Sequence, residues 1–151
     1  MNNRVSLYWD FENVRVPDQA ECLIDFAQSR GYVVTNKVYS HWSRETSKSK
    51  YVLDRCGFER IHVWEKGRNS ADRKLKSDCL AELYSSWSSD IIIIVSGDGG
   101  FASLVRKLQR RRKQVIVFGP PGGTSSKLER WANERCDNEL YSAEDLWWLV
   151  G

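Results

Sequence analysis

Short apolar runs alternate with helical patterns along most of this sequence, and that alternation constrains the fold more than any other feature. The run Ile91–Val95 (IIIIV) is β-branched throughout, which is typical of a central strand covered on both faces. Strands are predicted at residues 5–11, 33–39, 61–64, 90–95 and 115–118. Alternation of strands with helices predicts an α/β domain with a mainly parallel sheet of five strands.

Helical periodicity fills the segments between these strands. Ser70 is expected to cap a helix over residues 71–84, in which Leu75, Cys79 and Leu83 recur at four-residue spacing. Further helices are expected from Pro17 to Gly31 and over residues 48–56, 101–112, 127–135 and 144–149.

Length and composition limit the class of protein. The chain has 151 residues, and we expect a single domain over residues 1–151. No apolar run approaches the ~20 residues that span a bilayer, so no membrane partner is expected. The start of the chain has no signal-peptide pattern, which predicts a cytoplasmic protein. A net charge of +3 by itself leaves the class of partner open.

Acidic residues stand where the predicted strands end. Asp10 closes the first strand and Asp98 follows the fourth, at the edge where parallel sheets place their functional crevice. Asp72 opens the helix before the fourth strand, on the side that should face the sheet. Such an all-oxygen set suits Mg²⁺ or Mn²⁺, ions that orient water for attack on a phosphodiester. Each acid also has a structural alternative, as a turn residue, a cap or a complement to the helix dipole.

Other catalytic classes fit the sequence less well. The run Gly97–Ala102 has the form GxGxxA, but the next strand ends in Val117-Phe118-Gly119, without the acid that a dinucleotide site needs for the ribose. The loop over residues 119–127 (GPPGGTSSK) lacks the spacing of a P-loop. His41 and His62 belong to no recognisable nucleophile motif, which disfavours serine or cysteine hydrolase chemistry.

Three segments resemble the NYN domains of the PIN-like nuclease superfamily. They are YWDFENV (residues 8–14), KGRNSADRKLKSD (residues 66–78) and VSGDGGFASLVRKLQRRRKQVIVFG (residues 95–119). The similarity runs from about Val5 to about Gly119 and shares features with the limkain-type and LabA-like branches.

This resemblance implies a three-layer, Rossmann-like (PIN-like) sandwich with strand order 3-2-1-4-5, and metal-dependent endoribonuclease activity. By the same resemblance, Asp10, Asp72 and Asp98 would be catalytic and would hold Mg²⁺ or Mn²⁺. Asn13 and Ser96 match polar motif positions that would support the site by hydrogen bonds, and Asp78 matches an acid of the LabA-like pattern only.

An RNA substrate, single-stranded or structured, would require cations beside the acids to neutralise phosphates. The cations nearest to the acids in sequence are Lys66, Arg68, Arg73 and Lys74. His41 and Trp42 are candidates for stacking on unpaired bases. A second basic run, residues 106–113, is a less favoured candidate, and its structural alternative is a solvated helix end.

One departure from the family pattern keeps two functions open. The pattern often reads SGDxDF, whereas Gly100 stands in place of its second aspartate. The first hypothesis is a metal-dependent ribonuclease. The alternative is a catalytically weakened NYN module that binds RNA or a protein partner in a regulatory role. The oligomeric state stays open, with a homodimer as one option.

Overall fold

The computed structural model describes residues 3–67, 70–97, 99–119 and 139–142 of the chain, which form an α/β sandwich. Its strands form one sheet, in which every neighbouring pair is parallel, in the order β3-β2-β1-β4-β5-β6. The strands are β1 (Arg4–Asp10), β2 (Tyr32–Ser40), β3 (Glu59–His62), β4 (Ile91–Val95), β5 (Gln114–Gly119) and β6 (Glu139–Ser142).

The predicted α/β class and the order of five strands, 3-2-1-4-5, are confirmed. Strand β6 extends the sheet beyond β5 and was not predicted, because its sequence ELYS is too short to show a period. The helices expected at residues 127–135 and 144–149 lie outside the described residues.

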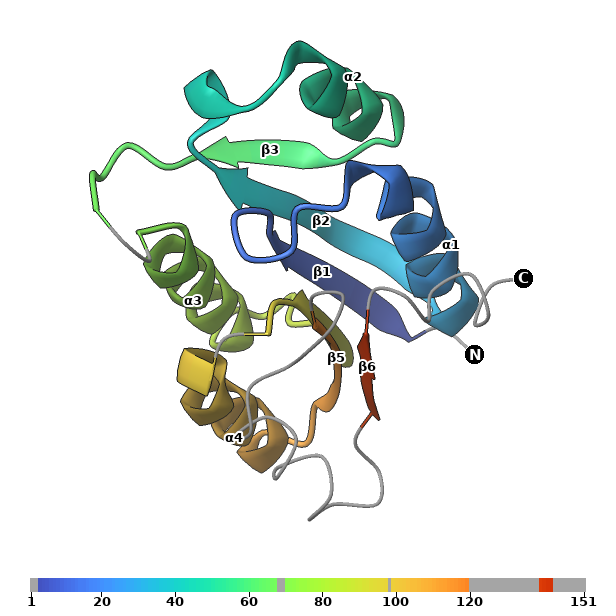
Figure 1. The fold of residues 1–151 in the computed structure, drawn as a ribbon. Coiled ribbons are helices and arrows are strands. Elements are labelled where there is room, and N and C mark those ends of the chain that lie inside the picture. Colours follow the sequence, from blue (N-terminus) through green and yellow to red (C-terminus); the bar gives the residue numbers. More distant parts are fainter. Residues whose placement is uncertain (1–2, 68–69, 98, 120–138, 143–151) are drawn as a thin grey trace.

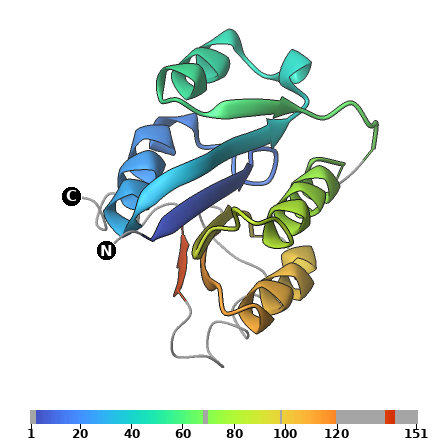
Figure 2. The same ribbon diagram turned by 180° about the vertical axis from the view of Figure 1, so that it is seen from behind.

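Helices cover both faces of the sheet (Figures 1 and 2). Helices α1 and α2 pack on one face, and α3 and α4 on the other. The α-helices are α1 (Ala20–Arg30), α2 (Ser47–Arg55), α3 (Ser70–Leu83) and α4 (Ala102–Arg110). Short 3₁₀ helices are η1 (Pro17–Gln19), η2 (Trp42–Arg44) and η3 (Gly99–Phe101). None of the helices in these described ranges is long and apolar enough to cross a membrane.

The alternation of side chains along the strands divides the core into two apolar layers. In β1, Leu7 and Trp9 belong to the layer under α1 and α2, whereas Tyr8 belongs to the layer under α3 and α4. Strand β4 is buried at all its positions, as its β-branched sequence predicts. The sheet is therefore closed on both faces, and its accessible functional edge is the one where the strands end.

Helix α3 buries the predicted stripe of Leu75, Cys79 and Leu83 against the sheet. Two acids, Asp72 and Glu82, are buried on the same helix. The helix begins at Ser70 itself, so the expected cap is a helical residue.

The register of the central strands brings the polar ends of the strands to one level. Strand β1 lies between β2 and β4, with Asp10 opposite Tyr39 and Trp9 opposite Val95. The end of β1 therefore stands beside the segment that leaves β4 at Ser96. The sequence predicts the catalytic acids at this carboxyl edge of the sheet.

Candidate active site

Two of the three predicted catalytic acids lie in the described residues, and both are buried at the carboxyl edge. Asp10 ends β1 and is 4% exposed, and Asp72, in the first turn of α3, is 5% exposed. Lys76 Nζ lies 3.0 Å from Asp72 Oδ1, as an ion pair that is not aligned as a hydrogen bond. Burial of carboxylates is costly without such partners or a cation. Asp98 lies outside the described residues.

A tight turn after β1 fixes the backbone next to Asp10. The Asp10 carbonyl accepts hydrogen bonds from the backbone N–H groups of Asn13 (3.2 Å) and Val14 (3.0 Å). The indole Nε1 of Trp9 donates to the Val14 carbonyl at 2.8 Å. Because the turn is held by its own backbone and by a core tryptophan, the direction of the Asn13 side chain is set by the fold.

The two predicted supporting residues, Asn13 and Ser96, are brought together. Asn13 Oδ1 accepts a hydrogen bond from the Gly97 backbone N–H at 2.7 Å and one from Ser96 Oγ at 3.4 Å. The side chain of Asn13 thus links the turn after β1 to the segment after β4 that leads directly to position 98. Its geometry is that of a residue that positions one half of the site against the other.

Asp78 is engaged with its neighbours. The Tyr39 hydroxyl donates to Asp78 Oδ2 at 2.7 Å, and Lys74 Nζ donates to Asp78 Oδ1 at 2.9 Å. Burial, and then the hydrogen bond to Asp78, raises the pKa of Tyr39 well above its ordinary value, so its hydroxyl remains a donor. One Asp78 oxygen therefore links α3 to β2, and the other pairs with Lys74 one turn earlier on α3. The role of Asp78 as a supporting acid stays a prediction.

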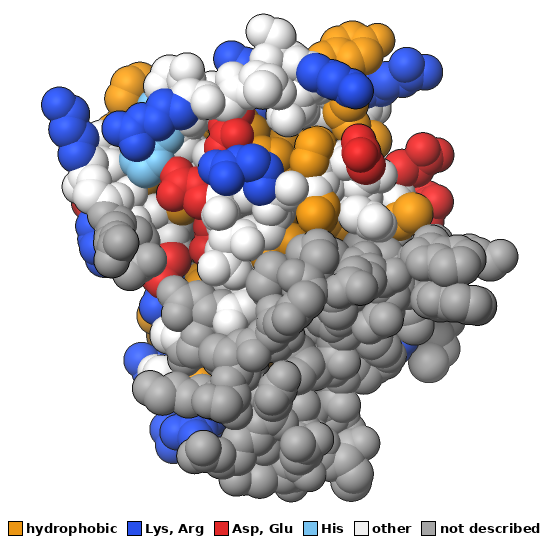
Figure 3. Space-filling model, in the orientation of Figure 1, with side chains coloured by type: hydrophobic (Ala, Val, Ile, Leu, Met, Phe, Trp, Pro, Cys, Tyr) orange, Lys and Arg blue, Asp and Glu red, His pale blue; other side chains and the backbone are white. Residues whose placement is uncertain are grey.

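Three of the four cations predicted to contact RNA lie around the connection from β3 to α3. Lys66 is exposed, Arg73 pairs with Glu65 at 3.0 Å, and Lys74 pairs with Asp78. Figure 3 shows Lys, Arg, Asp and Glu side chains gathered around a histidine on this side of the molecule. Arg68 lies outside the described residues.

The second basic run lies at the other edge of the sheet. Helix α4 runs back from the carboxyl edge, and the run leads into Gln114, the first residue of β5. Most of its side chains are exposed. Its position supports the interpretation as a solvated helix end and separates it from the candidate acids.

The expectation that His41 and Trp42 stack on bases is wrong. Trp42 is 3% exposed, donates from Nε1 to the Ile61 carbonyl at 3.0 Å, and packs against Phe11 with ring centroids 5.3 Å apart. His41 is also buried, with both ring nitrogens engaged. A ring that is covered by its own chain offers no face to a base.

His41 instead joins three segments at the carboxyl edge. Its Nδ1 contacts Glu12 Oε1 in the turn after β1, and its Nε2 lies 2.7 Å from the Glu65 carbonyl and 3.2 Å from Ser70 Oγ. The Glu65 carbonyl and then the Glu12 carboxylate raise the pKa of His41, because the imidazolium alone can donate from both nitrogens. The position of Glu12, two residues after Asp10, is the only sequence signal for this cluster.

His41 is expected to make stability depend on pH. A raised folded-state pKa means that the stabilisation is complete below about pH 6.5, the ordinary value, and is lost as the pH rises through the folded-state pKa. His41→Gln should therefore flatten the pH dependence of the free energy of unfolding, measured in urea from pH 5.5 to 8.5. Equal slopes in the wild type and His41→Gln would contradict this assignment.

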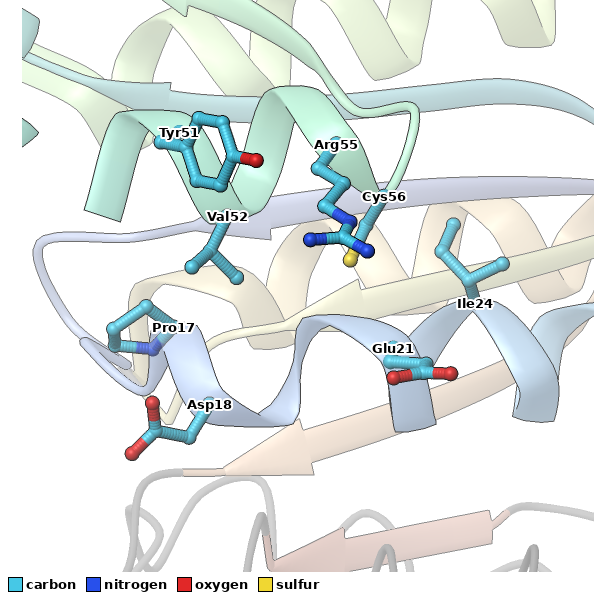
Figure 4. Close-up of a pocket in the computed structure, with 8 residues that line it drawn as sticks. All are labelled: Pro17, Asp18, Glu21, Ile24, Tyr51, Val52, Arg55 and Cys56. Atoms are coloured by element: carbon cyan, nitrogen blue, oxygen red, sulfur yellow. The ribbon is translucent and has the colours of Figure 1, made fainter. Parts of the chain in front are cut away.

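Two cavities lie beside helices. One, of about 380 Å³, lies between the end of β3 and the first turns of α3, and includes Arg73 and Lys74 in its lining. The other, of about 420 Å³, lies between α2 and the segment formed by η1 and α1, and Asp18, Glu21 and Arg55 are among the residues that line it (Figure 4). The second contains none of the predicted site residues, whereas the cavity at α3 adjoins the helix turn that carries Asp72.

The described ranges do not by themselves form a metal cluster. Among residues 3–67, 70–97, 99–119 and 139–142, no group of three or more His, Cys, Asp and Glu side chains is placed to hold a metal ion. The predicted set has Asp98 as its third member, which is not among these residues. The ligand set therefore stays a prediction.

Comparison with known proteins gives one family. No curated protein matches the chain significantly. The family model of the NYN domain, a family of generally nuclease-like proteins, matches residues 4–139 and so confirms the family resemblance. With the parallel α/β sandwich and its strand order, this match shows that the chain belongs to the NYN domain family.

Proposed function

We propose that this protein is a Mg²⁺- or Mn²⁺-dependent endoribonuclease that hydrolyses RNA phosphodiester bonds, with Asp10, Asp72 and Asp98 as its catalytic acids. The observation that carries the proposal is the burial of Asp10 and Asp72 at the carboxyl edge of the sheet, in a family of nuclease type. Buried acids at the functional edge of a parallel sheet are a costly arrangement that an active site explains.

The donor set fits a hard divalent cation. Asp10 and Asp72 offer carboxylate oxygens, the ligands that Mg²⁺ and Mn²⁺ prefer. Lys76 neutralises Asp72 Oδ1 at 3.0 Å, and a divalent cation would compete with it for that oxygen. When bound, the ion would orient an attacking water and stabilise charge on the phosphodiester.

The remaining residues hold the acids and the RNA in place. Asn13 fixes the segment after β4 through Ser96 and Gly97, and links it to the turn that follows Asp10. Lys66, Arg73 and Lys74, with Arg68, neutralise phosphates of the bound strand. The cytoplasmic location remains part of the proposal, and a homodimer stays one option for the oligomeric state.

A second candidate is a catalytically weakened module that binds RNA or a protein partner. The observation that favours it is Gly100, which is exposed in η3, between β4 and α4, at a position where the family pattern often has an acid. A site with one carboxylate fewer binds a divalent cation less tightly.

Metal dependence separates the two functions. Cleavage of a labelled single-stranded RNA should require added Mg²⁺ or Mn²⁺ and stop in excess EDTA, while the thermal unfolding midpoint should stay the same, because the apolar core needs no metal. RNA binding without cleavage at any metal concentration would favour the weakened module. Cleavage at full rate in EDTA by a nuclease-free preparation would exclude the metal mechanism.

A further inference from the structure

The cavity at the start of α3 has an aromatic wall and a cationic wall. The segment at the end of β3 contributes His62 and Trp64, and the exposed side of α3 contributes Arg73 and Lys74. Its volume of about 380 Å³ lies in the range of small-ligand sites, about 300–1,000 Å³. Asp72 belongs to the same turn of α3 but is buried, so the cavity and the candidate acids share one helix start.

Trp64 is the most exposed large apolar side chain in the described part of the chain. It is 84% exposed, and its ring packs against His62, with centroids 4.2 Å apart and planes inclined by 54°. An indole left in water at the mouth of a cavity is available for stacking by a planar ligand. Nucleobases use such aromatic platforms whatever their sequence, because every base has a π-face.

The two cations beside Trp64, Arg73 and Lys74, form ion pairs with acidic side chains. Arg73 pairs with Glu65 at 3.0 Å, both side chains being mostly exposed, and Lys74 pairs with Asp78 at 2.9 Å while half-exposed itself. The Arg73–Glu65 pair is exposed on both sides, and such pairs are weak and screened by salt, so a phosphate can replace Glu65. Asp78 is only 17% exposed, so a phosphate would join it as a second acceptor for the half-exposed Lys74. The cavity thus places a stacking surface next to phosphate-binding groups. This arrangement matches a nucleotide within a strand, which has a base next to a phosphate.

We infer that this cavity binds an unpaired base of single-stranded RNA, with the base stacked on Trp64 and the adjoining phosphate held by Arg73 and Lys74. The inference rests on the proposed function, since it assigns the part of the protein that holds the RNA strand. A base anchored here keeps the strand beside the turn of α3 that carries Asp72. Unpaired RNA is selected because a base in a duplex has no free face for Trp64.

A surface at the opposite edge of the sheet also combines aromatic and basic groups. Trp87 and Tyr84 are exposed after α3, and the Arg111 guanidinium lies 4.5 Å from the centroid of the Tyr84 ring. This surface lies at the amino edge of the sheet, away from the candidate acids. Trp87 is therefore the matched control for Trp64: the same residue type, exposed, at the opposite edge.

The test measures the affinity of the full chain for a labelled oligouridylate in EDTA, which keeps the RNA intact. Trp64→Ala is expected to weaken binding about 5- to 100-fold, the range for loss of one stacked base. Trp64→Phe should restore most of the affinity, and Trp87→Ala should bind like the wild type. Thermal unfolding of Trp64→Ala should match the wild type because the side chain is exposed.

Two further measurements identify stacking as the cause. An oligomer of the same length without bases should bind the wild type about as weakly as the oligouridylate binds Trp64→Ala. The affinity of Trp64→Ala for this base-free oligomer should equal that of the wild type. Trp64→Ala should leave the salt dependence of binding unchanged, whereas Arg73→Ala should reduce the slope by about 1.

The outcomes separate this inference from the proposed function. If the wild type binds and cleaves RNA but Trp64→Ala binds equally well, the base site is wrong and the nuclease proposal stands. A loss in Trp87→Ala instead of Trp64→Ala places the RNA at the opposite edge and also overturns the base site. If Trp64→Ala loses as much affinity for the base-free oligomer as for the oligouridylate, stacking is not the cause of the loss. If the wild type binds no RNA at all, both proposals fail, and the exposed Trp64 then belongs to a contact with a protein.

Discussion

Asp10→Asn and Asp72→Asn are each expected to lower the rate of RNA cleavage about 10²- to 10⁴-fold, the several kcal/mol that a catalytic ion supplies to the transition state. The substitution keeps the size of each side chain and removes the charge that would hold the ion. Affinity for RNA should hold or rise, because a negative charge that faces phosphates is lost. Asp98→Asn is expected to behave in the same way.

Cleavage should be followed under single-turnover conditions at saturating RNA, with affinity measured separately in EDTA. The paired variants Lys66→Ala and Arg68→Ala give the reverse pattern: weaker binding with a shallower salt dependence, and cleavage preserved at saturation. Asp72→Asn also loses its contact with Lys76, so its unfolding midpoint must be compared with that of the wild type. Unchanged cleavage in Asp10→Asn would falsify the nuclease proposal and leave the binding module as the better account.

The sheet was predictable because the local sequence of its main strands is typical of buried strands. The β-branched run Ile91–Val95 is buried on both faces, and such a run has few stable alternatives to a central parallel strand. The strand order came from the family resemblance, and the structure confirms it. Strand β6 has only four residues and becomes a strand through pairing with β5, which no local pattern records.

The site was predictable only where one segment decides a residue's position. Asp10 ends a strand and Asp72 opens a helix, so their places at the carboxyl edge follow from local structure. The His41 cluster joins side chains and backbone from four separate segments, and only tertiary packing brings them together.

Two tryptophans also show that the local sequence does not decide whether a side chain is buried. Trp42 and Trp64 both follow strands next to polar residues, yet one is buried and the other is 84% exposed. Trp42 is covered because the Phe11 ring and the Ile61 carbonyl lie against it. Which of two aromatic side chains is covered depends on what packs over it, and that information is not in the segment itself.

Glu82→Ala is expected to lower the free energy of unfolding by about 3 kcal/mol, since each buried donor left without an acceptor costs about 1–3 kcal/mol. Glu82 is 1% exposed at the end of α3, and its carboxyl group accepts hydrogen bonds from the Tyr8 hydroxyl (2.7 Å), the Ser89 backbone N–H (3.2 Å) and Ser6 Oγ. Burial, and then Glu82, raises the pKa of Tyr8 far above its ordinary value, so the Tyr8 hydroxyl stays a donor. One side chain thus satisfies donors from β1 and from the segment that precedes β4.

Urea and thermal unfolding measure this loss, with an expected fall in the unfolding midpoint of about 6–12 °C for a chain of this size. Glu82→Gln keeps one acceptor oxygen and should lose less than Glu82→Ala. Glu21→Ala, an exposed glutamate in the first turn of α1, is the control for a lost surface charge and should change stability by less than about 1 kcal/mol. Because Glu82 lies at the amino edge, cleavage per folded molecule should be unchanged well below the midpoint. If Glu82→Ala unfolds like the wild type, water or another acceptor replaces the carboxyl group, and the hydrogen bonds to Glu82 do not stabilise the fold.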